Sequence, residues 1–296
     1  MSTASTIPAS TSPGPADPEP ADPRPAGRVS TEDRKSVPFT AAVETLALAG
    51  RRLVHLRKAP GRLLAVTLNS LITMLAIGYV FKDAVIVPGG GSYPEFLLPA
   101  ALMQVGLASI APTAIAVAMD LKGGLTDRFR SLPITRPSVL IGHTIGDLVV
   151  GLIALVLVVG AGVLVGGRVH TGFLPLLAGL GLLVVFLYVM IWVGVLLGLT
   201  MRNPESIDGI GAVMTLGLSF LSNAFMSIDR LPSWLRPIAE WNPVSSVTNA
   251  VRQLWGNPVA VGTDFPSRHP GVVIAVSLTV VFVLATLFSF RRYRVA

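Results

Sequence analysis

Residues 173–199 read FLPLLAGLGLLVVFLYVMIWVGVLLGL, a stretch without a single charged side chain. An α-helix rises about 1.5 Å per residue, so roughly 20 apolar residues cross the hydrocarbon core of a bilayer, which is about 30 Å thick. Within that core the backbone must satisfy its own hydrogen bonds, and only helices and closed β-barrels can do so. The stretch lacks the alternating pattern of a barrel strand, and it therefore predicts a transmembrane helix.

Five more segments of the chain have the same apolar character. They lie at residues 63–81, 96–119, 139–165, 210–228 and 271–290. The composition agrees, since 52% of the residues are hydrophobic and only 13% are charged, against roughly 25% charged residues in a soluble domain. The sequence predicts an all-α, polytopic membrane protein with six transmembrane helices, and it excludes a soluble globular fold.

Basic residues are distributed unequally between the loops on the two sides of these segments. One side holds Arg51, Arg52, Arg57, Lys58, Arg62, Lys122, Arg128, Arg130, Arg136, Arg202, Arg291, Arg292 and Arg294, and the other holds only Lys82, Arg168, Arg230, Arg236, Arg252 and Arg268. Because Lys and Arg concentrate in cytoplasmic loops, both termini are expected in the cytoplasm. This sorting, with anionic membrane lipids as partners, accounts for the net charge of +7, and no nucleic-acid-binding module is expected. The excess of Arg over Lys indicates a GC-rich bacterial genome, hence a bacterial plasma membrane.

Residues 1–38 differ from the rest of the chain, with eight prolines among Ser, Thr, Ala, Asp and Glu. Such a composition buries too little apolar surface to offset the entropy of ordering, and it predicts a disordered cytoplasmic tail. The tail has no apolar core like that of a signal peptide, so the first transmembrane segment should direct insertion. Residues 39–296 are expected to form the six-span domain.

An amphipathic helix is predicted before the first span. Its apolar residues share one helical face, while Arg51, Arg52, Arg57 and Lys58 fall largely elsewhere. Such a helix would lie along the inner membrane surface. The alternative is that these cations simply flank the first span.

Two short helices are predicted after the fifth span, at residues 232–239 and 243–254. Pro232 and Pro243 would each occupy a first helical position. Trp234, Leu235, Ile238 and Trp241 share one face of the first helix, and Val244, Val247, Val251 and Leu254 share one face of the second. These helices are too short to span, and they suit a re-entrant or interfacial pair anchored by tryptophan. An ordinary surface loop is the alternative.

Motifs for nucleotide hydrolysis or hydrolytic catalysis are absent from the sequence. No Gly-rich phosphate loop, zinc-protease motif or nucleophile elbow occurs, and there is no cysteine. No catalytic residue, metal site or cofactor is therefore expected in this chain. If the protein performs energetic work, a partner or an ion gradient must supply the energy.

Polar residues inside the predicted spans are few. His143 and Asp147 stand four residues apart on one face of the third span. They would make a structural contact, serve in gating or couple a proton. Asn69, Gln104 and Asn223 are expected to form interhelical hydrogen bonds or to line a substrate path.

The inner loop at residues 120–137, DLKGGLTDRFRSLPITRP, combines a short helix-compatible run with a Leu-Pro break. Such a segment could present a compact charged and apolar face to a cytosolic partner. A solvated loop whose arginines only fix the topology is the alternative.

Several short pieces of the chain, in this order, resemble type-2 ABC-transporter permeases, especially those of the daunorubicin-resistance type. The matching pieces are Gly124 to Pro133 with Gly142 and Asp147, Arg202-Asn203-Pro204-Glu205, Leu231-Pro232 with Trp234-Leu235, Asn242-Pro243-Val244, and Arg252-Gln253-Leu254-Trp255-Gly256. The resemblance covers residues 40–294.

This resemblance implies an exporter in which two six-span subunits, identical or different, form the membrane path. Two separate ATPase subunits, which bind ATP and Mg, would dock on the cytoplasmic side. By resemblance the coupling element contains Gly124, Asp127, Arg128, Leu132 and Pro133. The connecting helix would contain Arg51 to Lys58, and the outer helices with Trp234, Trp241, Asn242, Pro243 and Arg252 would cover the exit route.

The substrate expected from the uncharged spans is amphipathic or apolar, such as a drug, lipid or glycoconjugate. Two alternatives stay open from the sequence. One is an ion-gradient-driven carrier using Asp147 and His143, and the other is a membrane-bound enzyme or scaffold.

Overall fold

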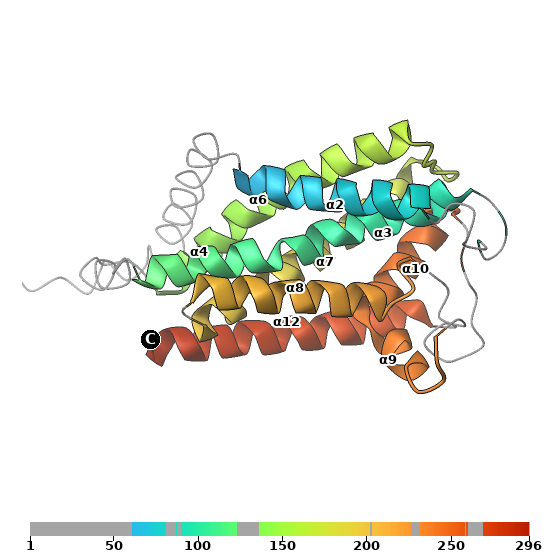
Figure 1. The fold of residues 1–296 in the computed structure, drawn as a ribbon. Coiled ribbons are helices and arrows are strands. Elements are labelled where there is room, and N and C mark those ends of the chain that lie inside the picture. Colours follow the sequence, from blue (N-terminus) through green and yellow to red (C-terminus); the bar gives the residue numbers. More distant parts are fainter. Residues whose placement is uncertain are drawn as a thin grey trace, which may run out of the picture. The chain divides into compact units, whose positions relative to one another are not determined.

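The computed structural model describes residues 61–80, 87, 90, 92–122, 136–201, 203–225, 231–257, 259 and 269–295, all within one compact unit, Pro38–Ala296. Every regular element in these ranges is an α-helix, which confirms the predicted class. The helices are α2 (Gly61–Val80), α3 (Tyr93–Ala108), α4 (Ile110–Lys122), α6 (Arg136–Leu164), α7 (Phe173–Thr200), α8 (Pro204–Phe220), α9 (Arg236–Trp241), α10 (Pro243–Trp255) and α12 (Pro270–Val295) (Figure 1). The predicted tail, connecting helix and coupling loop lie outside the described residues.

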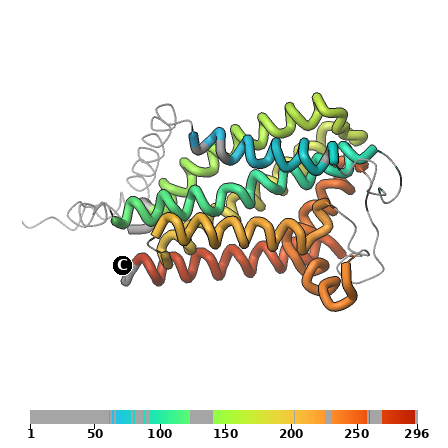
Figure 2. Tube along the Cα trace, viewed as in Figure 1, coloured from blue at the N-terminus to red at the C-terminus, as the bar shows by residue number. Residues whose placement is uncertain are grey.

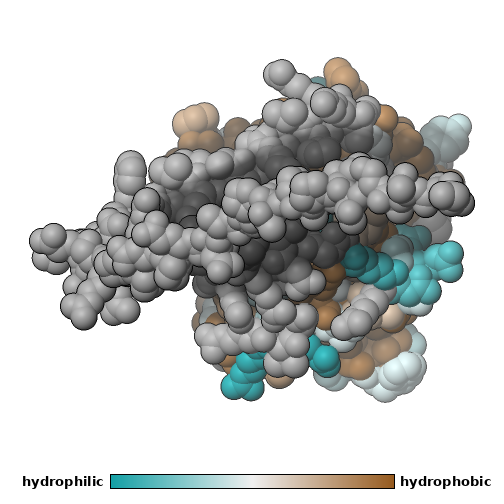
Figure 3. Space-filling view, turned by 90° about the vertical axis from the view of Figure 1, so that its left-hand side faces the viewer, coloured by the Kyte–Doolittle hydropathy of each residue, from teal (hydrophilic) through white to brown (hydrophobic). Residues whose placement is uncertain are grey.

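The long helices run side by side in one bundle (Figures 1 and 2). Helix α7 is central, since it packs against α3, α4, α6, α10 and α12. Helix α2 covers α3 and α6, and α8 packs mainly on α4. Successive passes run in opposite directions, so that α9 and α10 lie at one end and α12 finishes at the other (Figure 1). Viewed from the end where α12 finishes, the visible flanks are largely apolar with some hydrophilic patches (Figure 3).

Four described helical stretches are long and apolar enough to cross a membrane: Tyr93–Lys122, Leu140–Leu164, Phe173–Thr200 and Pro270–Tyr293. They support a multi-pass membrane protein. The described apolar stretch of α2 is Val66–Ile77, which is shorter than a span, and α8 has 17 residues. The predicted number of six spans therefore stays a prediction.

The second predicted span is divided in two at Ser109, where α3 ends and α4 begins. Pro112 explains the break, because proline has no backbone N–H and its ring clashes with the carbonyl four residues earlier. The backbone N–H of Ser109 instead bonds the carbonyls of Gly106 and Leu107, and its hydroxyl also donates to Gly106 O.

The helix of the fifth predicted span, residues 210–228, ends earlier than predicted. Helix α8 begins at Pro204, because the Asn203 side chain accepts a hydrogen bond from Glu205 N and caps the helix. It ends at Phe220, and residues 221–225 form turns and bends. Residues 222–225, two polar and two apolar, are buried at the end of the bundle without continuing the helix.

Of the two short helices predicted after it, the second is confirmed and the first begins later than predicted. Helix α10 starts at Pro243, as expected, while α9 starts at Arg236 and not at Pro232. Pro237 gives the reason. A helix beginning at Pro232 would need an N–H at Pro237, whereas in α9 this proline lies in the first turn, where no N–H is required.

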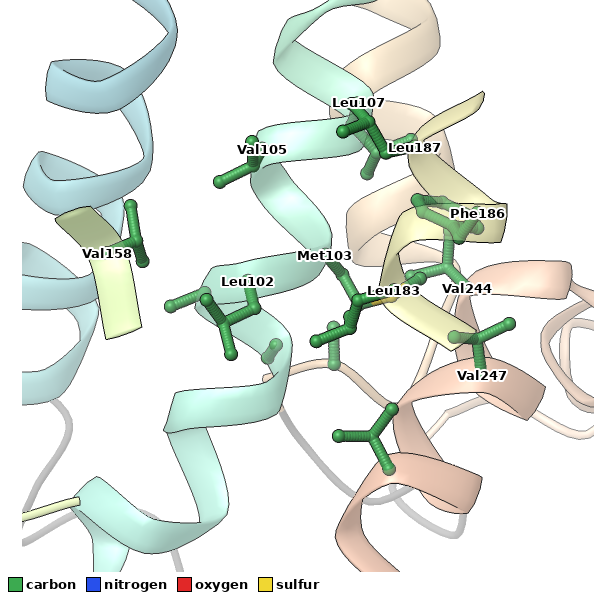
Figure 4. Packing of buried hydrophobic residues seen from close by; sticks show 14 of the residues in the cluster. Leu102, Met103, Val105, Leu107, Val158, Leu183, Phe186, Leu187, Val244 and Val247 are labelled. Atoms are coloured by element: carbon green, nitrogen blue, oxygen red, sulfur yellow. The ribbon is translucent and has the colours of Figure 1, made fainter. Parts of the chain in front are cut away.

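The core forms where α3, α7 and α10 meet. Met103 of α3 lies beside Leu183 and Phe186 of α7, next to Val244 and Val247 of α10 (Figure 4). All five side chains are buried. This packing fixes the position of α10 at the end of the bundle, where Asn223, Asn242 and Arg252 lie.

Candidate functional site

Arg252 of α10 is completely buried, with an exposed fraction of 0%. Its Nε donates to Phe96 O at 3.0 Å, Nη1 donates to Asn223 O at 3.0 Å, and Nη2 donates to Ala224 O at 2.8 Å. One guanidinium thus joins α10 to the beginning of α3 and to the turn after α8.

The charge of Arg252 is balanced by dipoles and an aromatic ring. Its Cζ lies 3.6 Å from the centre of the Phe96 ring, a cation–π contact. No described carboxylate forms an ion pair with it. Burial lowers the pKa of the guanidinium to about 9, against a smaller opposing effect of Tyr93, so Arg252 stays protonated at neutral pH. Backbone carbonyls just beyond a helix C-terminus are favourable partners for such a cation.

Asn242 connects the end of α8 with the start of α10. Its Oδ1 accepts from Val244 N at 2.9 Å and caps α10, with Pro243 in the first turn. Its Nδ2 donates to Leu218 O at 2.9 Å and to Leu221 O at 2.7 Å. These carbonyls belong to the last turn of α8, where no intrahelical donor is available. One amide therefore satisfies groups at two helix ends.

Asn223 adds a third connection between the same two elements. Its backbone N–H donates to Ser245 Oγ at 3.1 Å, and its Nδ2 donates to Asn249 Oδ1 at 2.5 Å. We call Asn223, Asn242 and Arg252 the α8–α10 clamp. All three residues are buried, so the clamp lies inside the protein at the α9–α10 end of the bundle.

The C-terminal end of α10 is fixed to the loop between α6 and α7. Gly256 has a positive φ of 68° and ends the helix. His170 N donates to Trp255 O at 2.9 Å, and Thr171 Oγ1 donates to Leu254 O at 2.7 Å. His170 also lies 3.2 Å from Glu95 of α3. The residues Arg252 to Gly256, quoted above for their resemblance, therefore lie where α3, α7 and α10 converge.

A second polar cluster lies toward the opposite end, between α4 and α6. His143 Nε2 lies 3.2 Å from Asp120 Oδ2, and His143 Nδ1 lies 3.6 Å from Asp147 Oδ2. Thr113 Oγ1 donates to Asp147 Oδ2 at 2.8 Å. We call Thr113, Asp120, His143 and Asp147 the α4–α6 cluster. It links the two helices that precede and follow residues 123–135.

The remaining predicted residues are more scattered. Gln104 Oε1 accepts from Ser219 Oγ at 3.0 Å, an α3–α8 hydrogen bond of the expected kind. Asn69 is exposed on α2 and has no side-chain hydrogen bond to another described residue, so it does not make the expected interhelical bond. Trp234 and Trp241 are exposed. Arg202, the coupling residues Gly124 to Pro133 and the cations Arg51 to Lys58 lie outside the described residues.

Several side chains of these clusters were not identified from the sequence. Thr113, Ser219 and Ser245 are small hydroxyl residues, which also occur in helices without any interhelical bond. Asn249 lies seven residues, about two helical turns, after Asn242 at the start of α10, so the two residues share one face of the helix. This spacing could have identified Asn249 from the sequence. Glu95 and His170 come from loops and helix ends that only the fold brings together.

Comparisons with known proteins agree with this architecture. Residues 43–255 match the family model of ABC-2 type transporters. The chain is 30% identical over 255 residues to the daunorubicin resistance ABC transporter permease protein DrrB1 of Streptomyces coeruleorubidus, covering 86% of this chain and 87% of that protein. It is 25% identical to the probable doxorubicin resistance ABC transporter permease protein DrrC of Mycobacterium tuberculosis, over 53% of this chain and 58% of that one. A putative transport permease of Porphyra purpurea is 23% identical over 72% of this chain and 74% of its own length.

Proposed function

Because the chain belongs to the ABC-2 type transporter family, we propose that it is the transmembrane subunit of an ATP-driven exporter. Two such subunits, identical or different, would form the membrane path, and separate ATPase subunits would bind ATP and Mg. The observation that carries this proposal is the similarity to a drug-resistance permease over 86% of the chain.

The proposed substrate is amphipathic or apolar, such as a drug, lipid or glycoconjugate, taken from the cytosol or inner leaflet. Helix α7, which packs at the centre of the bundle, contains no ionisable residue except Tyr188. In α6 the ionisable residues lie in the first half of the helix. A charged substrate would lose its hydration without finding a partner along such a path.

The α4–α6 cluster would transmit the motion of the ATPase to the membrane helices. Residues 124–133 are proposed to contact the ATPase subunit, and α4 and α6 are their direct continuations in the chain. A movement of this loop would shift the equilibrium between two arrangements of the membrane helices only if both α4 and α6 move with it. The side-chain link from Asp120 through His143 to Asp147 would make them respond together.

The α8–α10 clamp would hold the opposite end of the path closed. It connects α3, α8 and α10 through groups that are buried from water, where each hydrogen bond that breaks without a new partner costs about 1–3 kcal/mol. A closed state stabilised in this way opens only when the ATPase supplies a comparable free energy.

Transport by reconstituted protein tests the proposal. The chain is co-reconstituted with a separate ABC ATPase subunit in inside-out vesicles, and accumulation of an uncharged fluorescent amphipathic compound is followed. We expect accumulation that requires ATP and that stops when the ATPase carries a catalytic-site substitution. Accumulation without ATP that collapses with a protonophore would contradict the proposal, and would support a gradient-driven carrier using His143 and Asp147.

A further inference from the structure

The short helix α9 carries an exposed apolar stripe. Trp234, Ile238 and Trp241 have exposed fractions of 71%, 53% and 51%. Ile238 and Trp241, three residues apart, lie on one side of α9, and Trp234 lies in the turn that precedes the helix. Ala239, on the opposite side, has an exposed fraction of 0%. The stripe therefore faces away from the protein.

The neighbouring helix α10 has the opposite environment. Its apolar residues Val244, Val247 and Val251 have exposed fractions of at most 1%. The two helices are joined only by Asn242, yet one is enclosed by protein and the other is not. The two helices therefore have different environments.

The bundle near α9 has the surface expected at the edge of the hydrocarbon core. Exposed apolar side chains lie at the ends of three helices on this side: Tyr79 near the end of α2, Leu164 at the end of α6, and Phe173 at the start of α7. Val272, in the first turn of α12, is also exposed. Helix α9 lies at the same end of the bundle, level with the start of α12 (Figures 1 and 2). Its stripe thus lies at the same end of the bundle as these exposed apolar side chains.

The chemistry and size of the stripe favour lipid over protein as its partner. Tryptophan is enriched at the boundary between headgroups and acyl chains, because its ring is apolar and its N–H can bond to water or headgroup oxygens. The three exposed fractions correspond to roughly 400 Å² of surface, whereas a stable protein interface buries about 800 Å² on each partner. A second copy of the chain would need a larger face than this.

We propose that α9 lies in the headgroup region of the leaflet at this end of the bundle, with Trp234, Ile238 and Trp241 against the acyl chains. Helix α10 stays within the protein. Lipid contact then fixes α9 from outside, while the α8–α10 clamp fixes α10 from inside. This inference does not depend on the substrate or on the ATPase.

Quenching of tryptophan fluorescence in nanodiscs tests this proposal. The chain has four tryptophans. Trp192 and Trp255 are buried, with exposed fractions of 2% and 1%, so a quencher in the lipid reaches only Trp234 and Trp241. The full-length protein is placed in phosphatidylcholine nanodiscs, with or without bromine atoms on the part of the acyl chain nearest the headgroup. We expect brominated lipid to lower the emission by about half, because two of the four tryptophans would contact lipid.

The variant W234F/W241F should lose most of this quenching, whereas the matched variant W192F, which removes a buried ring, should keep it. Thermal unfolding of both variants shows whether the fold is retained. Strong quenching of Trp234 and Trp241 by aqueous iodide, with none by brominated lipid, would place α9 in water and overturn the proposal. Quenching by neither agent would show a protein covering the stripe, and would overturn it as well.

Discussion

Among the side chains of the described residues, Arg252 joins three parts of the chain that are distant in sequence. Its three hydrogen bonds end on the carbonyls of Phe96, Asn223 and Ala224. A guanidinium suits this role because its donors are held in a rigid, planar arrangement that can reach several acceptors at once. Lysine has the charge without that geometry.

We expect Arg252→Met to destabilise the protein by about 3 kcal/mol or more, since three buried carbonyls lose their donor. Arg252→Lys should restore only part of the loss, because one ammonium cannot reach all three acceptors. Thermal unfolding in detergent or nanodiscs measures both. Equal unfolding temperatures for Arg252→Met and the wild type would show that the clamp does not stabilise the fold.

Asn242 allows the two functions of one side chain to be separated. Serine is as good a helix N-cap as asparagine, but its hydroxyl cannot make both bonds from Asn242 to Leu218 O and Leu221 O. Asn242→Ser should therefore lose the attachment of α8 and keep the cap of α10. Asn242→Ala should cost about 1 kcal/mol more, which is the value of the cap. If the two variants unfold at the same temperature, the cap contributes nothing.

At the level of the helices, the close contact between α4 and α7 depends on two glycines. A Cβ at Gly194 would lie 2.6 Å from Ile110 O, and one at Gly198 would overlap Ala114 O. Both atoms belong to the backbone of α4, which cannot move aside as a side chain can. Small residues permit such close approach of helices in membranes, where packing rather than hydrophobicity drives association.

Gly194→Ala should destabilise the bundle by about 1–3 kcal/mol, because the added methyl group forces α4 and α7 apart. Gly181 provides the matched control on the same helix, since nothing lies within 4 Å of its Cβ position. Gly181→Ala should be neutral or stabilising by up to about 1 kcal/mol, from the higher helix propensity of alanine. Similar losses for both substitutions in thermal unfolding would indicate a general effect of glycine on the helix, not a packing effect.

Considered as a whole, the described molecule has polar clusters toward its two ends and an apolar core between them. The α4–α6 cluster lies on the helices that precede and follow residues 123–135 in the chain, and the α8–α10 clamp lies at the far end of the bundle. A transporter that admits substrate at one side and releases it at the other needs coordinated changes at both ends. The proposed exporter function places the energy input at the first cluster and the exit at the second.

On that function, His143→Ala should lower the amount of substrate transported per ATP by about two- to thirtyfold, because a lost coupling contact is worth roughly 0.5–2 kcal/mol. The ATPase rate itself should change little. The measurement is the ratio of transport to phosphate release in co-reconstituted vesicles. Val156→Ala, on the exposed side of α6, is the control. A parallel loss of both activities in His143→Ala would indicate failed assembly and not failed coupling.

Local composition was enough to predict the helical class and the membrane location, since long uncharged apolar stretches have few other solutions in lipid. The family was predicted from the resemblance of short motifs, not from composition. It also predicted α10 from Pro243, because its cap and first turn are encoded within a few residues. The break at Ser109 and the late start of α9 were missed, although Pro112 and Pro237 signalled them in the sequence.

Only the tertiary structure decided where α8 ends and what Arg252 and Asn223 contact. The partners of these side chains lie up to 156 residues away in the chain. No periodicity or spacing encodes such a pair, because it depends on how the helices pack. The same holds for the difference between α9 and α10: both have an apolar stripe in the sequence, but the bundle buries one stripe and leaves the other exposed.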